Sequence, residues 1–367
     1  MLLNTILSAA LAIGPVAAPS TSDIPAAGLR DRLIGLVEDR HVTAGLIRVQ
    51  DGEDHWSGAV GVRDLITRKP AGADGHFRIG SVTKTFVATV LLQLVDDGRL
   101  ALDDRVERHL PGVVPGGERI TVRQVLQHTS LLHDYMSHPG HSTNRWRGEA
   151  RFDDYTPEQL LDVAFTADRD DEPGEPWRYS NTNYIVAGLL IEKLTGRPYG
   201  EEVKRRILRP LDLRHTSVPG HRASLPAPHA RGYEPLPTQP PTIVDATRMD
   251  PSLDWAAGEM VSTTRDLATF VTALIEGRLT SRASLAEMRR MTSADPLFRY
   301  GLGLQEFTLP CADGPKPVWG HTGQLIGYLT FALTDGQGRS LVLSLNPYEQ
   351  DPPAAAVVAV GVAAFCR

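Results

Sequence analysis

A serine and a lysine three residues apart open the apolar stretch "SVTKTFVATVLLQLV". On a helix, residues three apart lie on the same face, so Ser81 and Lys84 would point into one space. The chain holds 5 lysines against 33 arginines, so Lys84 stands out in a chain that otherwise uses arginine for positive charge. A desolvated lysine, unlike an arginine, can lose its proton and then accept the proton of a serine hydroxyl. The pair therefore predicts a serine nucleophile with a lysine base.

By itself this spacing is weak evidence, because 18 serines and 5 lysines give about 0.25 such pairs by chance. A capped helix start with a surface lysine would also explain it. Two other stretches carry groups of the same chemistry. "PGEPWRYSNTNY" places a phenol and an amide at Tyr179 and Asn181, before an expected helix, and "PVWGHTGQLIGY" places His321 at the start of an expected strand.

Together, the three stretches resemble the serine β-lactamase and penicillin-binding protein superfamily, whose motifs are S-x-x-K, Y-x-N and K/H-T-G. The flanking segments "ITVRQVLQHTS", "STTRDLATF" and "YGLGL" are also similar to that family. The "GHTG" form is most similar to the exported serine D-Ala-D-Ala carboxypeptidases of actinomycetes. The resemblance implies the β-lactamase/DD-peptidase fold, α/β plus all-α, with an antiparallel sheet flanked by helices and an inserted helical domain.

Carried over by motif, the resemblance implies that Ser81 is the acylated nucleophile and Lys84 its proton acceptor. Tyr179 would relay the proton to the leaving amine, and Asn181 would hold the substrate's amide. Backbone N–H groups of Ser81 and Gln324 would form the oxyanion hole. The substrate-binding residues that complete the expected site are His321, Thr322, Gly323, Gln324 and Gln305.

The activity that this resemblance implies is an exported serine hydrolase of D-alanyl-D-alanine carboxypeptidase type, working through an acyl-enzyme and acylated by penicillins. The alternatives are a D-amino-acid amidase, D-aminopeptidase or esterase, then a β-lactamase, then a non-catalytic penicillin-binding module. We expect small or cell-wall peptides and β-lactams as ligands, no cofactor, and a monomer.

Two departures from the family pattern bear on the substrate. The related carboxypeptidases have an arginine and a threonine where this chain has Gln305 and Gln324. Recognition of a free carboxylate is expected to weaken, unless Arg299 replaces the missing charge. In "HTSLLHDY", Leu131 stands where the family has glycine, and we expect it to exclude a left-handed backbone there.

Hydrophobic periodicity outlines the elements that would hold these residues. Helices are expected over 27–40, from Ser81 to the "DDG" turn, over 183–196, 262–277 and 352–366, with a capping box at Thr156 to Gln159. Strands are expected over 43–52, 55–64, 301–309, 326–335 and 338–346. Residues 216–255, with eight prolines, predict an irregular connection. We expect a discontinuous α/β domain of 27–85 and 245–367, a mainly helical domain of 86–244, and the site between them.

Composition narrows the class of protein. The 367 residues are 41% hydrophobic and 22% charged, with a net charge of −6, which excludes a disordered chain and disfavours nucleic acid as a partner. Residues 1–18, "MLLNTILSAALAIGPVAA", are uncharged, too short to span a bilayer comfortably and end in small residues, which is typical of a secretory signal. A disordered apolar leader is the alternative. No later segment is apolar enough for a membrane span.

Two cysteines, Cys311 and Cys366, make an even count, which favours a disulfide in an exported chain and two buried thiols otherwise. The histidines of "HTSLLHDYMSHPGH" match no common zinc spacing, so we expect a polar loop and no metal.

Overall fold

The computed structural model describes residues 24–166, 173–174, 176–349 and 351–366. The expected secretory signal, residues 1–18, lies outside the described residues. Within them, no helix is both long enough and apolar enough to cross a membrane.

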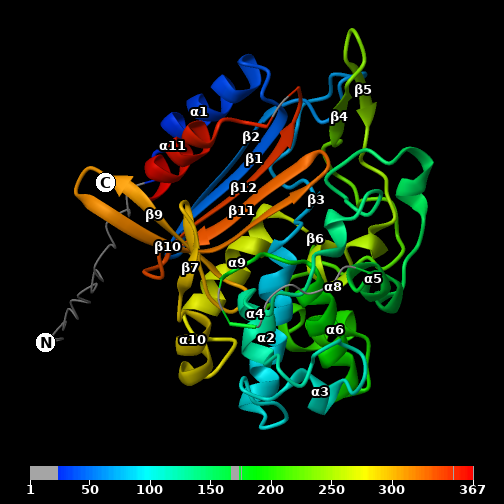
Figure 1. Cartoon of the computed structure of the whole chain (residues 1–367). Helices are drawn as coiled ribbons and strands as arrows, with labels where there is room; N and C mark the ends of the chain where they lie inside the picture. Colours follow the sequence, from blue (N-terminus) through cyan, green and yellow to red (C-terminus); the bar gives the residue numbers. More distant parts are fainter. Residues whose placement is uncertain (1–23, 167–172, 175, 350, 367) are drawn as a thin grey trace, which may run out of the picture.

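An antiparallel sheet of eight strands forms the centre of the described chain, in the order β2-β1-β12-β11-β10-β9-β8-β7. Strand β1, early in the chain, pairs with β12, near its end, so distant parts of the sequence contribute neighbouring strands to one open sheet (Figure 1). This confirms the predicted fold class. The strands are β1 Val42–Asp51, β2 Asp54–Gly61, β7 Thr292–Asp295, β8 Phe298–Tyr300, β9 Gln305–Cys311, β10 Gly314–Leu325, β11 Tyr328–Thr334 and β12 Arg339–Pro347.

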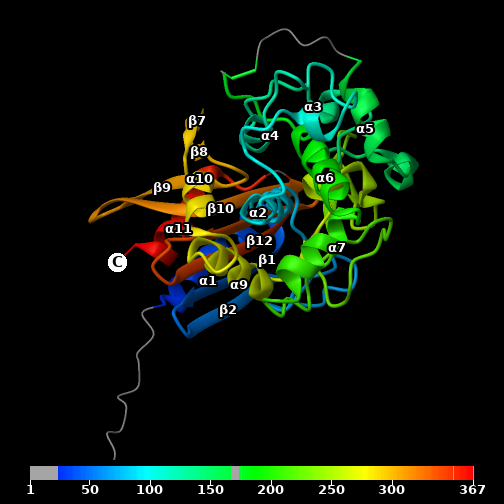
Figure 2. The same cartoon turned by 90° about the horizontal axis from the view of Figure 1, so that it is seen from below.

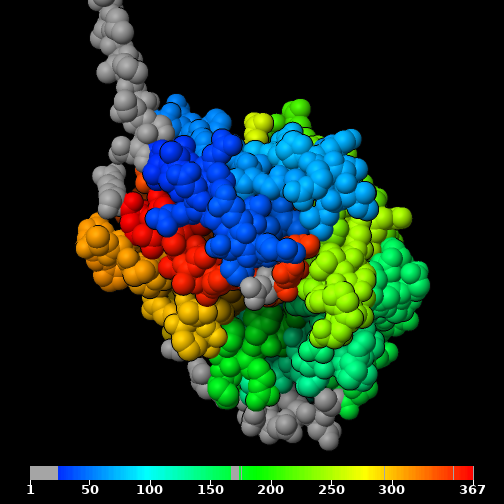
Figure 3. Space-filling view, turned by 90° about the horizontal axis from the view of Figure 1, so that it is seen from above, coloured from blue at the N-terminus to red at the C-terminus, as the bar shows by residue number. Residues whose placement is uncertain are grey.

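Helices α1 (Ala26–Glu38) and α11 (Ala354–Phe365) lie side by side over one face of the sheet, as the blue and red surfaces of Figure 3 show. Leu33 and Phe365 from these helices are buried with Ile47 of β1 in one apolar core. The predicted disulfide is present and joins Cys311, at the end of β9, to Cys366, just after α11. The first and last helices of the described chain thus pack together on this face, and the disulfide fixes α11 to β9.

Helices α2 (Val82–Asp96) and α9 (Thr264–Ile275) cover the opposite face. Figure 2 shows α2 near the centre of the molecule, between the sheet and the helices around α6. Most side chains of α2 are buried, and Phe86 stacks on Phe270 of α9. Because α2 packs on both the sheet and the neighbouring helices, the residues at its start are fixed relative to both.

Most of the regular elements described between α2 and α9 are helices, joined by long irregular segments, and α10 follows α9. The predicted capping box at Thr156 and Gln159 opens α5. The predicted domain boundaries stay a prediction. The remaining elements are α3 Val106–His109, α4 Val122–Gln127, α5 Pro157–Ala164, α6 Thr182–Thr195, α7 Tyr199–Val203, a π-helical turn Lys204–Leu208, α8 Trp255–Gly258, α10 Arg282–Met288, 3-10 turns at Tyr135–Ser137, Gly148–Phe152 and Pro251–Leu253, and the short strand pairs β3 Phe77–Arg78 with β6 Val261–Ser262 and β4 Tyr233–Leu236 with β5 Thr242–Asp245.

Periodicity missed several strands. His321 was expected at the start of a strand but lies well inside β10, which begins at Gly314. In "GPKPVWGHTGQL", Pro315, Pro317 and Gly320 interrupt any alternation of apolar residues. The hairpin β4–β5 lies within the proline-rich segment that was expected to be irregular. These strands are defined by pairing with neighbours that are distant in sequence or by a turn, and single-strand patterns do not report such pairing.

The prediction for Leu131 was wrong. Its backbone is left-handed, with φ of +59°, although the side chain is branched. The side chain is buried at 3% exposure, so packing of the surrounding chain stabilises a conformation that costs a non-glycine residue roughly 1–2 kcal/mol.

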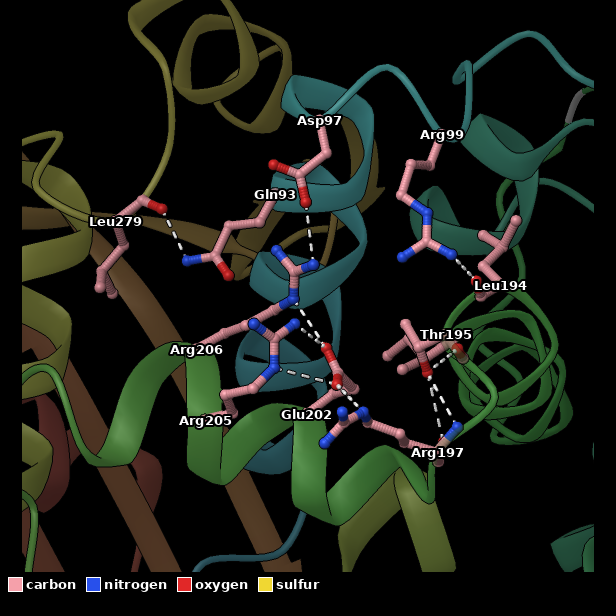
Figure 4. A network of polar contacts seen from close by, with 11 residues as sticks. Gln93, Asp97, Arg99, Leu194, Thr195, Arg197, Glu202, Arg205, Arg206 and Leu279 are labelled. Atoms are coloured by element: carbon pink, nitrogen blue, oxygen red, sulfur yellow. Dashed lines mark hydrogen bonds and ion pairs between the residues drawn. The ribbon is translucent and has the colours of Figure 1, made fainter.

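An ion-pair network ties the far end of α2 to the helices beside it (Figure 4). The fully buried Glu202 carboxylate accepts hydrogen bonds from Arg205 and Arg206, and Arg206 also pairs with Asp97 at the end of α2. Burial raises the pKa of Glu202, but the hydrogen bonds and charges of the two arginines outweigh it and leave that pKa below its ordinary value.

Candidate active site

The first turn of α2 brings the serine and the lysine together. Ser81 is the residue that caps α2, but its hydroxyl makes no capping hydrogen bond. Its Oγ lies instead 3.0 Å from Lys84 Nζ and 2.8 Å from the Tyr179 hydroxyl. Tyr179 comes from the turn before α6, nearly a hundred residues later in the chain. The three predicted catalytic side chains therefore meet at one oxygen.

Lys84 is completely buried on the inner face of α2. Burial of the ammonium lowers the pKa of Lys84 from 10.5 to about 7, against the opposing effect of the Asp134 and Asp254 carboxylates. Besides Ser81, its Nζ donates to Asn181 Oδ1 at 2.8 Å and to the Ala257 carbonyl at 2.7 Å. These two acceptors hold the amine against the serine, and its low pKa makes the neutral base available near neutral pH.

The phenol of Tyr179 is kept neutral. Burial raises the pKa of Tyr179 above its ordinary value, despite the hydrogen bond to Ser81. A protonated phenol can donate a proton or relay one, but it cannot act as the initial base. The environment thus separates two roles, with Lys84 suited to accept a proton and Tyr179 suited to deliver one.

His128 supports the Tyr179 ring, a contact that sequence analysis missed. It sits at the end of α4 in a left-handed conformation, and its ring stacks on Tyr179 with centroids 4.2 Å apart. The Ser180 N–H donates to His128 Nδ1 at 3.2 Å, and Asn183 Nδ2 approaches the same atom at 3.1 Å. The motif "QHTS" contained this histidine, but no pattern within it points to a residue fifty positions away.

The other ring nitrogen of His128 is connected through Tyr300 to His321 of the HTG motif. With Nδ1 accepting, Nε2 carries the hydrogen and faces the Tyr300 hydroxyl at 3.2 Å, which in turn lies 2.9 Å from His321 Nε2. Burial lowers the pKa of His321 to about 3. His321 is therefore an uncharged imidazole, fixed by Tyr300, and supplies no positive charge to a ligand.

Asn181 is engaged inside the protein at both ends of its amide. Its Oδ1 accepts from Lys84, and its Nδ2 donates to Asp134 Oδ2 at 3.0 Å. Burial raises the pKa of the Asp134 carboxyl. Asn181 also faces the cavity beside Ser81, so its predicted contact with a substrate amide stays a prediction.

Strand β10 approaches the start of α2 closely, beside the two backbone N–H groups of the predicted oxyanion hole, which stays a prediction. A side chain on Gly323 would meet the Ile79 carbonyl at 1.9 Å and the Ser81 amide nitrogen at 3.0 Å. A side chain on Gly80 would meet the Gln324 amide nitrogen at 2.8 Å. Glycine at both positions thus allows the backbone N–H groups of Ser81 and Gln324 to lie beside the same space.

Gln305 is oriented by its neighbour on β10. Its Oε1 accepts from the Thr322 N–H at 2.7 Å and from the Thr322 hydroxyl at 3.1 Å. Because the carbonyl end is used, the amide NH₂ of Gln305 is the end left to face the cavity. Gln324 is more exposed and contacts Asp351 at 3.3 Å. Both glutamines offer neutral donors.

Arg299 does not replace the missing arginine in this structure. Its guanidinium is paired with Glu306, which also accepts from the Trp319 indole N–H at 2.9 Å. The described residues that line the cavity include no arginine or lysine. A free carboxylate entering here would meet neutral donors only.

The site opens into a cavity of about 280 Å³. Its lining comes from the start of α2, from α8, β9 and β10, and from the turn before α6, and includes Ser81, Tyr179, Asn181, Gln305, His321, Thr322, Gly323 and Gln324. A larger cavity of about 860 Å³ lies between α7 and the 213–222 segment and contains none of these side chains. Volume does not identify the site here, whereas the position of Ser81 does.

Metal ligation has no support among the described residues, where no group of three or more histidine, cysteine, aspartate or glutamate side chains could hold an ion. His138 and His141 contact each other on the surface, with their Nδ1 atoms 3.3 Å apart.

The sequence of this chain is similar to one protein family and to several curated proteins. The family profile described as Beta-lactamase matches residues 29–360. Among curated proteins, the chain is 27% identical over 327 residues to "Penicillin-binding protein 4*" of Bacillus subtilis, covering 85% of this chain and 70% of that protein. It is 30% identical to the putative penicillin-binding protein PbpX of the same organism, covering 62% of this chain and 52% of that one.

Two solved structures are similar over nearly the whole chain. A D-stereospecific amidohydrolase from Streptomyces sp. is 40% identical with a TM-score of 0.84, covering 93% of this chain and 98% of that one. The D-amino acid amidase of Ochrobactrum anthropi SV3, complexed with L-phenylalanine, is 28% identical with a TM-score of 0.80, covering 92% and 96%.

Proposed function

Since the chain belongs to the Beta-lactamase family and is a serine hydrolase of that family, we propose that it hydrolyses amides of D-amino acids through an acyl-enzyme on Ser81. The observation that carries this proposal is the convergence of Lys84 and Tyr179 on the Ser81 hydroxyl. The sequence left the amidase as an alternative to the carboxypeptidase, and the described residues that line the cavity, which include no arginine or lysine, favour the amidase.

The reaction follows from the protonation states. Neutral Lys84 takes the proton of Ser81 as Oγ attacks the amide carbonyl carbon, and the N–H groups of Ser81 and Gln324 stabilise the oxyanion. The C–N bond then breaks, and Tyr179 donates its proton to the departing nitrogen. The ammonium of Lys84 then returns a proton to the Tyr179 oxygen. Water then attacks the acyl carbonyl carbon and loses a proton to the same pair, the bond from that carbon to Ser81 Oγ breaks, and the pair returns the proton to Oγ as the carboxylic acid is released.

The leaving group is the point on which amidase and carboxypeptidase differ. A carboxypeptidase must hold the free carboxylate of the departing residue, and a fixed cation does this best. Here the candidate positions are Gln305 and Gln324, His321 is uncharged, and Arg299 is paired with Glu306. An uncharged leaving group, as in a simple amide, needs no cation, so this cavity wall can bind it without the missing arginine.

The similarity to a D-stereospecific amidohydrolase and a D-amino acid amidase supports the same choice. The penicillin-binding relatives support acylation of Ser81 by β-lactams. Export is also part of the proposal, supported by the apolar residues 1–18 and by the disulfide, which forms in oxidising compartments.

The test uses four substrates with the purified protein: D-alaninamide, L-alaninamide, and a blocked peptide ending in D-Ala-D-Ala with a free or an amidated C-terminus. We expect release of ammonia from the D-amide and faster cleavage of the amidated peptide than of the free acid. Ser81→Ala should abolish both. Faster cleavage of the free acid would return the assignment to a carboxypeptidase.

A further inference from the structure

Asp254 lies in the wall of the catalytic cavity and has an unsatisfied charge. Its side chain is buried at 1% exposure, and it lines the cavity together with Ser81 and Asn181. Thr143, from the facing loop, donates its hydroxyl to Asp254 Oδ1 at 2.8 Å. The other oxygen, Oδ2, has no hydrogen-bond partner in the described part of the chain. Buried carboxylate oxygens are normally satisfied, so this atom has room for a further donor beyond those that the described residues place on it.

The arginines near Asp254 are held by other groups through only part of their guanidinium, since Nε and Nη1 of Arg78 and Nε of Arg147 have no hydrogen-bond partner among the described residues. Arg78 and Arg147 lower the pKa of Asp254 together with Lys84 and the Thr143 hydrogen bond, although burial raises it overall to about 6. Arg78 donates to the carbonyls of Ala223, Thr247 and Met249, and Arg147 donates to the Tyr155 hydroxyl. None of these groups forms an ion pair with Asp254 among the described residues. The carboxylate is therefore charged at neutral pH and open to a further cation.

The backbone keeps this carboxylate next to the reacting groups. Asp254 directly precedes α8, whose Ala257 carbonyl binds Lys84 and whose Gly258 lines the same cavity. A side chain on Gly258 would approach Asp254 Oδ1 to 3.0 Å, so glycine leaves room for the carboxylate. One short element thus positions both the catalytic base and an acidic group in the substrate's space.

We propose that Asp254 and Thr143 form an acidic subsite that binds the free α-ammonium group of the substrate, while the substrate's amide carbonyl lies at Ser81. The preferred substrates are then amides of unblocked D-amino acids, or peptides whose N-terminal residue is a D-amino acid. This inference rests on the proposed amidase function and extends it to the amino side of the substrate.

An ammonium fits this subsite better than a metal ion or a neutral group. A single carboxylate and one hydroxyl provide too few ligands for a divalent cation, whereas an ammonium needs one anion and a few acceptors. Binding would also help the base. Asp254 is one of two carboxylates that raise the pKa of Lys84, and a bound ammonium would offset that charge and favour neutral Lys84.

The test compares D-phenylalaninamide with N-acetyl-D-phenylalaninamide and 3-phenylpropanamide, which lack the ammonium, in the full chain and in Asp254→Asn. We expect the wild-type protein to prefer the free amine. In Asp254→Asn, KM for D-phenylalaninamide should rise roughly tenfold to a hundredfold, the range of a charged hydrogen bond, while kcat/KM for the other two amides changes less than threefold. An equal loss on all three amides would show a structural role for Asp254 and overturn the proposal.

Glu259→Gln is the matched control. Glu259 follows α8, is also buried, and accepts hydrogen bonds from Tyr199 and Gly220 beside the larger cavity. Burial raises the pKa of Glu259 to about 8, so an amide changes no charge at neutral pH. This variant should keep the wild-type preference. If it loses that preference as Asp254→Asn does, the effect belongs to displacement of α8 and not to a subsite.

Binding can be tested even if no amide is hydrolysed. Protection of Ser81 from a fluorescent penicillin reports occupancy without turnover. D-phenylalaninamide should slow labelling of the wild-type protein but not of Asp254→Asn, and N-acetyl-D-phenylalaninamide should protect both equally or neither. Protection without hydrolysis would reject the proposed amidase and keep the subsite. Absence of selective protection by the free amine would reject the subsite.

Discussion

The imidazole of His128 stacks against the phenol of Tyr179, with ring centroids 4.2 Å apart and an interplanar angle of 29°. The contact joins the end of α4 to the turn before α6. It places a neutral, hydrogen-bonded ring behind the side chain that must deliver a proton, so the position of the Tyr179 hydroxyl depends on a residue that does not touch Ser81.

His128→Phe tests this support. Phenylalanine keeps a ring behind Tyr179 but loses the hydrogen bonds to Ser180, Asn183 and Tyr300. Because a small displacement of a catalytic group can cost up to about a hundredfold in rate, we expect kcat to fall by roughly tenfold to a hundredfold with KM nearly unchanged. A rise in KM alone would contradict a positioning role for His128.

The pH profile reports the charge of Lys84. Since burial lowers the pKa of Lys84 to about 7, the neutral base is lost below that pH, and kcat/KM should rise as the pH increases through about 7. Asp134 raises this pKa, so Asp134→Asn should move the acid limb of the profile to lower pH. A limb that stays in place or moves upward in Asp134→Asn, as followed by the initial rate of amide hydrolysis, would rule out Lys84 as the titrating base.

Gln305→Arg should change the choice between leaving groups. The new guanidinium would stand beside Thr322 and could pair with a free carboxylate in the cavity. The rate on a D-Ala-D-Ala acid relative to its amide should rise about tenfold or more. Gln305→Met, similar in length and without a donor, is the control and should not raise this ratio. The explanation of substrate choice by a missing cation fails if arginine and methionine give the same ratio.

Glu202→Gln should destabilise the fold without entering the active site. Removing one charge from a buried ion pair costs about 3 to 5 kcal/mol, and since the Arg205 side chain is 47% exposed we expect about 2 kcal/mol in chemical denaturation. The pKa of Glu202 is lowered, so its contribution is present above pH 4.5 and is lost as the pH falls through the folded-state pKa. The gap in stability between wild type and Glu202→Gln should therefore narrow in acid.

Glu201→Gln provides the comparison for that measurement. The Glu201 carboxylate pairs with Lys204 at 3.6 Å, with both side chains about half exposed. Exposed pairs contribute on the order of 0.5 kcal/mol. A loss in Glu201→Gln as large as that in Glu202→Gln would show that burial of the network in Figure 4 is not what makes it stabilising.

The motifs in the sequence were enough for the fold class, through the family that they resemble, and local patterns were enough for several elements. The apolar stripe after Ser81 predicted α2, and Thr156 with Gln159 predicted the start of α5, because helix periodicity and capping depend on residues within a few positions of each other. Spacing within one turn also predicted that Ser81 and Lys84 share a face. The bounds of strand β10 were harder to predict, because its prolines and glycines hide the alternation of apolar and polar residues. Its pairing with β9 and β11 holds it in the sheet.

The rest depends on contacts between distant segments. Burial or neighbours far away in the chain produce the pKa of Lys84, the left-handed backbone of Leu131, the support of Tyr179 by His128, and the Asp254 oxygen that has no partner among the described residues. Residue types and their spacing determined which chemistry this protein could attempt. Only the tertiary structure decided which groups are charged, which are neutral and which lack a partner, because desolvation and hydrogen bonding are properties of the packed chain.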